Sequence, residues 1–470
     1  MIDKVVGSVE EAIARIPNGA SIAIGGFGSA GFAAELVEGL AQTDRTDLHI
    51  ICNGLRGEGA TKIFSEHRVS RLSAGFPFGD TFNAEVFSGR IEVEVLPQGT
   101  LAERLRAGGA GIAAFYTPTS IGTAISDGTF PKRFDENGEP IAFVEPKEIR
   151  EFNGRKYVLE YGLRPDFGFV KATKADRLGN LYFRLTSRNF NPAIAMAARC
   201  TIVQAQEIVE PGELDPSDVH VPGAFVDIIV HVPKEAEIPT SRGGRPTASE
   251  RAAAEVKQIG FTREEIAKNI ARDVGEGWVV NLGAGMPVLV AKHVSPDKRV
   301  TLHHENGILG AGGPPEVPDP DLTDAGGQPV TLRDGAAIFD SAQSFAIVRG
   351  GYLDVTVLGG LQVAVNGDLA NWYIPKGTTG VGGAMDLVQG AKQVWVAMEH
   401  TDRRGNPKIL NKCSFTLTGP GVVKRVYTDL GVFSIDNGSL ELLEAAPGVS
   451  IDYIRERTEP TFSVREGVLA

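Results

Sequence analysis

The sequence predicts an α/β protein built from two related open α/β domains that are joined by a linker. Apolar, strand-like runs alternate with helix-like stretches along the chain, and one unit of helix, turn, strand and glycine-rich loop occurs twice. The length of 470 residues allows two to four domains at roughly 100–200 residues each. The expected boundaries are 1–233 for the first domain, 234–258 for the linker and 259–470 for the second domain.

The first copy of the repeated unit begins near the N-terminus. Ser8 and Glu11 form a capping-box pattern, which predicts a helix that runs through Ile16. A Pro-Asn-Gly turn follows, and the apolar run 21–24 then predicts a buried strand that leads into a glycine-rich loop at 25–31.

The second copy repeats this order in the other half of the chain. Thr262 and Glu265 form another capping box, a Gly-Glu-Gly turn occupies 275–277, and the run 278–282 ends in Gly283 and Gly285. The match predicts a gene duplication, so each domain is expected to contain a mostly parallel sheet.

A further pair of segments supports the duplication. The segments 166–182 and 354–373 each contain two β-runs and a turn with Asp and Asn. Between the copies, Pro-Thr-Ser-Arg-Gly-Gly-Arg-Pro is a linker composition. The polar stretch 130–161 departs from the α/β rhythm and predicts an inserted hairpin or a surface loop.

The composition excludes several classes of protein. The 57 glycines have no Gly-X-Y period, which excludes collagen, and 42% hydrophobic residues exclude a disordered chain. The net charge of −12, without a long Lys/Arg run, argues against nucleic acid or a membrane as a partner. No segment is apolar over the roughly 18 residues of a membrane span. The 3 scattered cysteines and the lack of a recognisable targeting signal predict a cytoplasmic protein.

The glycines at 26–31 fit the G-x-G-x-x-G pattern of dinucleotide-binding turns, between a strand-like and a helix-like run. That pattern also requires an acidic residue after the next strand, 48–52, where this chain has Asn53. The missing acid weakens the dinucleotide interpretation. A glycine-rich turn remains, which could donate backbone N–H groups to an anion.

Three other segments place candidate functional residues beside predicted strands or helices. Gln98 follows the strand-like run 91–96, and the glycine-rich stretch 377–383 leads into a helix-like run. Glu305 follows the strand-like run 300–304, at the strand end where open α/β sheets bind ligands.

The residues alone leave the role of Glu305 open between base, metal ligand, nucleophile and a carboxylate bound by nearby backbone N–H groups. His303 and His304 face opposite sides of a strand, so they cannot easily share one metal ion with Glu305. No metal site is therefore predicted.

Taken together, these segments resemble family I coenzyme A transferases, and within them the 3-oxoacid CoA-transferases. The segments that carry the resemblance are GGFGSAG at 25–31, PQGTLAERLRAGGAGI at 97–112, FYTPTSIGT at 115–123, KADRLGNLYFR at 174–184, NLGAGMP at 281–287, ENGILG at 305–310, SFAIVRGG at 344–351, GDLANW at 367–372 and GGAMDLV at 382–388. They cover nearly the whole chain, in the order of an α-subunit type followed by a β-subunit type.

The resemblance implies a ping-pong transfer of coenzyme A through a glutamyl-CoA thioester on Glu305. It implies that Gln98 and the backbone near Gly382 and Gly383 stabilise the oxyanion. The positions that match the family's CoA pocket or active-site cleft are Gly25, Gly26, Gly28, Asn53, Asn281, Gly283, Gly285, Asn306 and Ala384.

The resemblance further implies acyl-CoA and carboxylate substrates, no metal or redox cofactor beyond the coenzyme A thioester, and a homodimer. The expected donor is succinyl-CoA and the expected acceptor a 3-oxoacid such as acetoacetate, with 3-oxoadipate as an alternative acceptor. An acyl-CoA hydrolase on the same fold, or a non-catalytic sensor of CoA or a dinucleotide, are alternatives of another class. The Lys or Arg residues that bind the CoA phosphates are not identified by the sequence.

Three positions depart from the family pattern. Phe32 replaces a proline after the first glycine-rich loop, and His304 replaces the serine before the glutamate. Pro375-Lys-Gly-Thr-Thr stands where the family has Pro-Gly-Lys-Met. The first difference is expected to reshape the CoA entrance, and the other two concern the acyl pocket.

Overall fold

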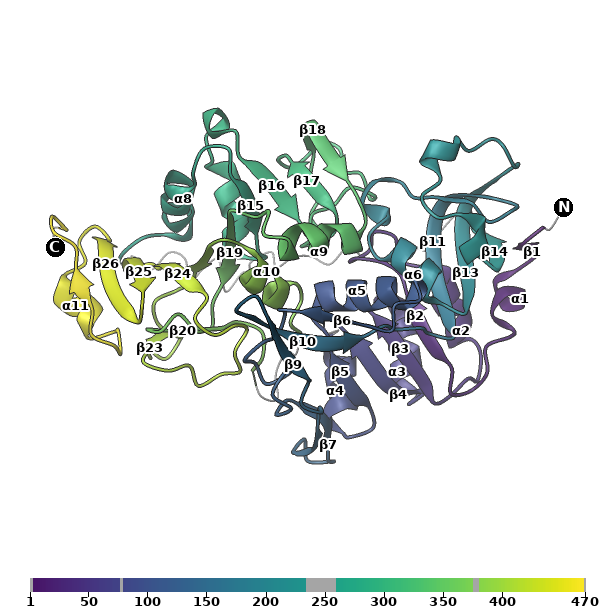
Figure 1. Ribbon diagram of the computed structural model, residues 1–470, viewed down its shortest axis with the longest axis horizontal. Coiled ribbons are helices and arrows are strands. Elements are labelled where there is room, and N and C mark those ends of the chain that lie inside the picture. Colours follow the sequence, from purple (N-terminus) through teal and green to yellow (C-terminus); the bar gives the residue numbers. More distant parts are fainter. Residues whose placement is uncertain (1–2, 77–78, 234–258, 375–379, 469–470) are drawn as a thin grey trace.

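The computed structural model describes residues 3–76, 79–233, 259–374 and 380–468, and its strands form two large sheets (Figure 1). The predicted linker, 234–258, lies outside the described residues. Every strand in the main path of the first sheet is parallel to its neighbours. In spatial order this path is β1 (Val5–Val6), β14 (Ile228–His231), β13 (Cys200–Val209), β11 (Phe167–Asp176), β2 (Ser21–Ile24), β3 (Leu48–Cys52), β4 (Val69–Ala74) and β5 (Glu92–Val95), and β12 (Leu181–Tyr182) pairs with β11.

The second sheet has a parallel centre and largely antiparallel edges. Its order is β18 (Leu332–Ile338), β17 (Ile308–Ala311), β16 (Thr301–His304), β15 (Val279–Leu282), β19 (Val355–Gly359), β22 (Val394–Ala397), β24 (Val423–Tyr427), β25 (Gly431–Asp436), β26 (Ser439–Ala445) and β27 (Ser463–Val464). The strands from β16 to β24 are mutually parallel. The α/β class predicted from the sequence, with a mostly parallel sheet in each half, is confirmed.

The helices of the described residues fall in both halves of the chain. They are α1 (Val9–Ile13), α2 (Ala34–Ala41), α3 (Gly57–Ser65), α4 (Gly79–Phe87), α5 (Gln98–Gly109), α6 (Asn191–Ala197), α8 (Arg263–Asp273), α9 (Ser341–Arg349), α10 (Ala384–Gly390) and α11 (Ile451–Arg455). The predicted capping box of α8 is complete, with Thr262 and Glu265 bonding each other's backbone N–H groups. The first predicted helix is shorter than expected and ends at Ile13.

The two halves share one strand order, as the duplication predicts. The order β3-β2-β11-β13-β14 in the first half corresponds to β16-β15-β19-β22-β24 in the second. The agreement extends to single hydrogen bonds at the start of the central strands. Asp166 accepts a hydrogen bond from the N–H of Ser21, and Asp354 accepts one from the N–H of Val279. The halves differ beyond β3 and β16, because Glu305 is followed by a β16–β17 hairpin that the sequence did not predict.

Helices from both halves pack against one another between the two sheets. Helix α5 of the first half contacts α9 and α10 of the second, and Figure 1 shows all three near the middle of the molecule. Leu101, Phe345 and Leu387 belong to one continuous hydrophobic core that spans both halves. This shared core fixes the position of the loops that face each other across the halves.

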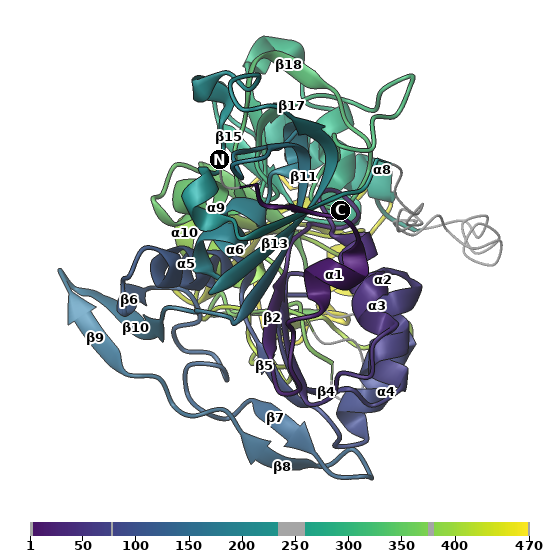
Figure 2. The ribbon, with the colours of Figure 1, turned by 90° about the vertical axis from the view of Figure 1, so that its right-hand side faces the viewer.

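The predicted insertion at 130–161 forms antiparallel strands outside the two large sheets. Figure 2 shows β7, β8 and β9 projecting from the side of the molecule. The strands are β6 (Ala114–Thr117), β9 (Ile149–Phe152) and β10 (Arg155–Tyr161) in one small sheet and β7 (Pro131–Phe134) with β8 (Pro140–Phe143) in a hairpin. A third small sheet contains β20 (Gln362–Ala364), β21 (Leu369–Ala370) and β23 (Ile409–Leu410).

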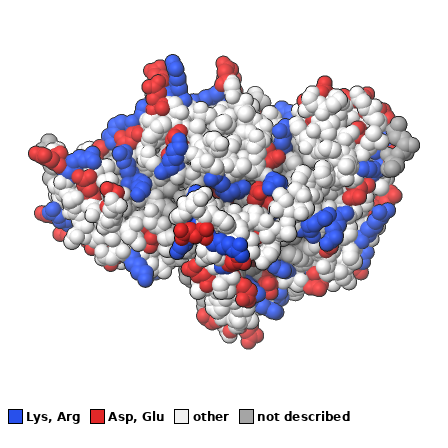
Figure 3. Space-filling model, viewed as in Figure 1, with Lys and Arg blue, Asp and Glu red and all other residues white. Residues whose placement is uncertain are grey.

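Acidic and basic side chains alternate over the surface shown in Figure 3, without a large area of one sign. The net charge of −12 is therefore not gathered into a single acidic area on this face. Among the helices of the described residues, none is both long and apolar enough to cross a membrane.

Candidate active site

A cleft between the two halves contains about 1920 Å³ of space that is free of protein atoms and partly open to solvent. Loops that follow strand ends line it, including those after β2 and β3 in the first half and after β15 and β16 in the second. The predicted site residues on its wall are Gly28, Asn53, Gln98, Gly283, Glu305, Gly382, Gly383 and Ala384. Residues that are far apart in the sequence thus meet in one cavity large enough for an extended ligand.

Glu305 is partly buried at the end of β16, on the wall of this cleft. Burial and the nearby charge of Asp324 raise the pKa of its carboxyl group, while a hydrogen bond from Asn281 opposes that rise. The Asn281 amide nitrogen lies 3.2 Å from a Glu305 carboxylate oxygen. A carboxylate that is poorly hydrated and has few hydrogen bonds is more reactive toward a carbonyl carbon than one in water.

Asn281 is fully buried and is oriented by a second buried residue, Thr356. The Thr356 hydroxyl donates to the Asn281 carbonyl oxygen at 3.1 Å, so the amide nitrogen faces Glu305 and the backbone carbonyl of His303. Asn281 was predicted to line the CoA pocket or the active-site cleft. The structure places it against Glu305, although it is not among the described residues on the cleft wall.

Gln98, the first residue of α5, joins the two halves at the cleft. Its amide nitrogen donates to Asn53 at 2.8 Å, and its backbone N–H donates to the carbonyl of Gly382 at 2.9 Å. The side-chain amide oxygen of Gln98, Oε1, is buried and has no hydrogen-bond partner among the described residues. This unpartnered oxygen lies 3.3 Å from where a Cβ on Gly383 would be, so it faces Gly383.

The predicted donors at Gly382 and Gly383 differ in their surroundings. The N–H of Gly382 donates to the carbonyl of Gly75 at 2.9 Å. This bond occupies the Gly382 N–H and holds Gly382 against the first half, so in this structure the donor predicted near these two glycines is better supplied by Gly383. The N–H of Gly383 has no partner in the described part of the chain and is the donor that remains.

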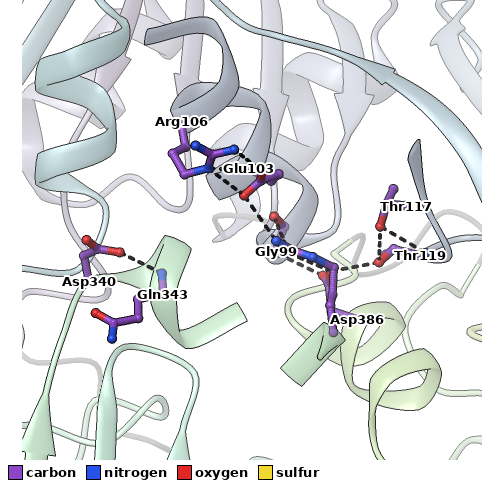
Figure 4. Close-up of polar contacts among 9 residues, drawn as sticks. Gly99, Glu103, Arg106, Thr117, Thr119, Asp340, Gln343 and Asp386 are labelled. Carbon is purple, nitrogen blue, oxygen red and sulfur yellow. Dashed lines mark hydrogen bonds and ion pairs between the residues drawn. The ribbon is translucent and has the colours of Figure 1, made fainter. Parts of the chain in front are cut away.

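Asp386, three residues after Gly383, also connects the second half to the first (Figure 4). Its carboxylate accepts from the N–H of Gly99 and from the Thr119 hydroxyl, each at 2.9 Å. Burial raises the pKa of Asp386 to about 6, and Arg349, 3.8 Å away, opposes this rise. A side chain of the second half thus caps the start of α5, next to Gln98.

Several predicted ligand-binding glycines have a packing role instead. A Cβ on Gly25 would lie 2.0 Å from the side-chain oxygen of Asn191, and one on Gly26 would lie 2.9 Å from Phe32. Gly285 takes a left-handed φ of 86° at the start of a short helical turn. None of these three glycines is among the described residues on the cleft wall, so their contact with CoA stays a prediction.

Asn306 and the two histidines also lie outside the cleft wall. Asn306 is buried and donates to the carbonyl of Thr323 at 2.7 Å, so it holds the turn after Glu305 in place. Burial lowers the pKa of His303 to about 3, so the ring is neutral and bonds Ser344 at 3.0 Å. In the described residues, no three His, Cys, Asp or Glu side chains are grouped to hold a metal ion.

The structure also identifies site residues that the sequence analysis did not single out. Asp386 lies within the quoted GGAMDLV segment, but its partner Gly99 is 287 positions away. Thr356 lies in an apolar strand, where it looks like an ordinary β-branched residue. Arg56 could have been found from one signal in the sequence: it follows the predicted strand that ends at Cys52, and such positions often face a ligand.

Comparison with solved structures shows which fold this chain shares with known proteins. An acyl-CoA transferase from Escherichia coli O157:H7 superposes with a TM-score of 0.79 at 24% identity, covering 99% of this chain and 95% of that one. The two α/β halves of this chain therefore have the fold of that acyl-CoA transferase.

Sequence comparison gives the family itself. The family described as Coenzyme A transferase matches residues 6–232 and 263–457, and this chain belongs to it. A mouse relative, named succinyl-CoA:3-ketoacid coenzyme A transferase 2A, mitochondrial, is 40% identical over 466 residues, which are 97% of this chain and 88% of the relative. A Helicobacter pylori relative, named as one of the subunits of a succinyl-CoA:3-ketoacid coenzyme A transferase, is 49% identical over 206 residues, which are 43% of this chain and 99% of the relative. The chain is therefore an enzyme, a CoA-transferase.

Proposed function

We propose that this enzyme transfers coenzyme A from succinyl-CoA to a 3-oxoacid such as acetoacetate, with Glu305 as the nucleophile. The partly buried Glu305 carboxylate in the cleft between the halves is the observation that carries the proposal. The names of the mammalian relatives support the donor and the class of acceptor.

In the first half-reaction, a Glu305 carboxylate oxygen attacks the thioester carbonyl of succinyl-CoA. The carbon–sulfur bond breaks, CoA leaves as a thiolate, and a mixed anhydride of succinate and Glu305 remains. The thiolate then attacks the glutamyl carbonyl carbon. Succinate leaves with the bridging oxygen, and Glu305 carries CoA as a thioester.

In the second half-reaction, the acetoacetate carboxylate attacks the glutamyl thioester and displaces the CoA thiolate, which forms a new mixed anhydride. The thiolate then attacks the acetoacetyl carbonyl, which releases acetoacetyl-CoA and the free Glu305 carboxylate. Every step exchanges a carboxylate and a thiolate at an acyl carbon. Because this sequence balances without electron transfer, we propose that no cofactor is required beyond the CoA thioester.

Each step passes through a tetrahedral oxyanion that needs hydrogen-bond donors. The unpaired N–H of Gly383 and the Gln98 amide lie on the cleft wall and are suited to this role. A half-turn of the Gln98 amide, with a matching half-turn of the Asn53 amide that keeps the bond between them, would present the Gln98 nitrogen where the unpartnered oxygen now lies. We expect that reversal when an oxyanion forms there.

A rate assay tests the proposed activity directly. Purified protein and succinyl-CoA are incubated with acetoacetate, with 3-oxoadipate, with other short carboxylates or with no acceptor, and thioester products are separated by chromatography. Transfer to acetoacetate supports the proposal. Transfer to 3-oxoadipate alone would show that 3-oxoadipate, and not acetoacetate, is the acceptor. Loss of the thioester without an acceptor would indicate a hydrolase, and binding without turnover a sensor.

The pH dependence of transfer reports on Glu305. Because the pKa of Glu305 is raised, the carboxylate is protonated at a higher pH than an ordinary glutamate with pKa 4.5, and kcat/KM is expected to fall below a midpoint above 4.5. Asn281→Ala removes a bond that favours the charged form, so its midpoint should move to still higher pH.

Asn371→Ala is the matched control for this pH experiment. Asn371 is likewise an asparagine, but it lies on the cleft wall and bonds Gly359 and Thr418 rather than Glu305. Its midpoint is expected to equal that of the unaltered enzyme. A midpoint in Asn281→Ala that stays constant or falls would show that the Asn281 contact does not stabilise the Glu305 carboxylate.

We also propose that the chain forms a homodimer, as the family resemblance implies. Light scattering coupled to size-exclusion chromatography should then give twice the chain mass of 50.0 kDa, and a mass of one chain would contradict the proposal. The cytoplasmic location stays a prediction, since the mammalian relatives are named as mitochondrial proteins.

A further inference from the structure

Arg56 lies between β3 and α3, on the wall of the cleft that contains Glu305. In the shared strand order, β3 of the first half corresponds to β16 of the second, whose end carries Glu305. The loops after these two corresponding strands therefore supply Arg56 from one half and Glu305 from the other.

The charges on this wall are few. Among the described residues that line the cleft, Arg56 is the only Lys or Arg, and Glu305 is the only Asp or Glu. An anionic ligand in the cleft would be repelled by the Glu305 carboxylate when that group is ionised. Arg56 is the single cationic side chain on the described wall that can compensate for this repulsion.

The protein does not supply a partner for the Arg56 guanidinium in the part of the chain that the structure describes. Other arginines with little exposure are paired. Arg68 donates to the carbonyl of Leu40 at 2.6 Å, and Arg104 bonds Glu94 at 2.7 Å. Arg56 is partly buried, has no such hydrogen bond or ion pair, and burial lowers its pKa. A guanidinium that has lost water without gaining a partner is costly, and a bound anion would remove that cost.

We propose that Arg56 binds an anionic oxygen group of the substrate in this cleft, which makes it a substrate-binding residue. This inference rests on the proposed function, whose substrates offer two such groups: the free carboxylate of the succinyl group and the phosphates of coenzyme A. The guanidinium fork can donate two parallel N–H bonds to either group.

Arg56→Gln tests this assignment, because glutamine keeps a polar side chain but removes the charge and the fork. Three Michaelis constants separate the two sources of the anion: those for succinyl-CoA, for succinate and for acetoacetyl-CoA, the last two measured in the reverse reaction. If Arg56 binds the carboxylate, KM rises roughly 10- to 100-fold for succinyl-CoA and succinate and stays constant for acetoacetyl-CoA. If it binds phosphate, KM rises for both thioesters and stays constant for succinate.

Lys62→Gln is the matched control, since it removes one positive charge from α3, the helix that follows Arg56, at a residue that is not on the cleft wall. Its three constants should equal those of the unaltered enzyme, and Arg56→Lys should restore part of the loss. Unchanged constants for all three substrates in Arg56→Gln would overturn the inference while leaving the proposed function intact.

A binding measurement keeps the two proposals separate. Calorimetric titration with free coenzyme A and with succinate reports Arg56 binding without any turnover. If the unaltered enzyme transfers no CoA from succinyl-CoA to a 3-oxoacid, the proposed function fails. Arg56 is then judged from whether Arg56→Gln weakens one of the two titrations, and equal affinities in both proteins would overturn the inference.

Discussion

Glu305→Gln is expected to abolish CoA transfer, with a loss in kcat of about 10⁴-fold or more. Glutamine has nearly the same shape and can still accept a hydrogen bond from Asn281, which now contacts a Glu305 carboxylate oxygen at 3.2 Å. The fold should therefore persist. The amide group, however, is far too poor a nucleophile to attack a thioester, so neither the anhydride nor the glutamyl-CoA thioester can form.

Trapping provides the second measurement for this prediction. The unaltered enzyme is incubated with succinyl-CoA alone and then treated with hydroxylamine or borohydride, and the peptide that contains residue 305 is analysed by mass spectrometry. Modification of Glu305 that depends on succinyl-CoA is expected in the unaltered enzyme and should be absent in Glu305→Gln. Borohydride reduces a thioester but leaves a free carboxylate unchanged, so the signal is specific to the intermediate.

Glu316→Gln is the control for loss of a carboxylate in the same half of the chain, because Glu316 is exposed. It should keep the full rate and the full yield of trapped Glu305. Glu305→Ala excludes hydrolysis of the introduced amide as a source of residual activity. Full transfer by a folded Glu305→Ala enzyme would rule out Glu305 as the nucleophile.

The fold could be predicted largely because its signals are local. Capping residues such as Thr262, apolar runs such as 48–52 and a unit that occurs twice are visible in single segments. The hairpin after Glu305 was missed, because its strand Ile308–Ala311 contains a glycine within a glycine-rich stretch and has little β-propensity of its own. Its pairing with β16 is a tertiary effect.

The site was only partly predictable, because it too depends on contacts between segments that are far apart in the sequence. Position after a strand end singled out Gln98 and Glu305, and the family resemblance added Asn53; all three reach the cleft. The direction in which a side chain points, and the contact that a glycine makes, depend on distant segments. The family resemblance assigned Gly25 to the CoA pocket or the active-site cleft, but only the structure shows that its close neighbour is Asn191, 166 positions along the chain.

Gly99→Ala is expected to have the second-largest effect on stability and activity, because the N–H of Gly99 donates to the Asp386 carboxylate across the two halves. A Cβ on Gly99 would lie 2.4 Å from a carboxylate oxygen of Asp386 and 2.7 Å from the ring of Phe345. Both neighbours are fully buried, so neither can move into solvent. We expect a stability loss of about 1–3 kcal/mol from overpacking, measured by denaturant unfolding.

The larger consequence of Gly99→Ala concerns catalysis, because Gly99 follows Gln98 and precedes the rest of α5. Pushing α5 away from Asp386 lengthens the bond between the Gln98 N–H and Gly382, now 2.9 Å, and moves the Gln98 amide away from the Gly383 N–H. A displacement of about 1 Å at this point is expected to lower kcat by about 100-fold with a small change in KM. Gly313→Ala is the matched control, because a Cβ there meets no atom within 4 Å, and it should keep both stability and kcat. A Gly99→Ala enzyme with unchanged kcat would show that the contact between Gly99 and Asp386 does not position Gln98.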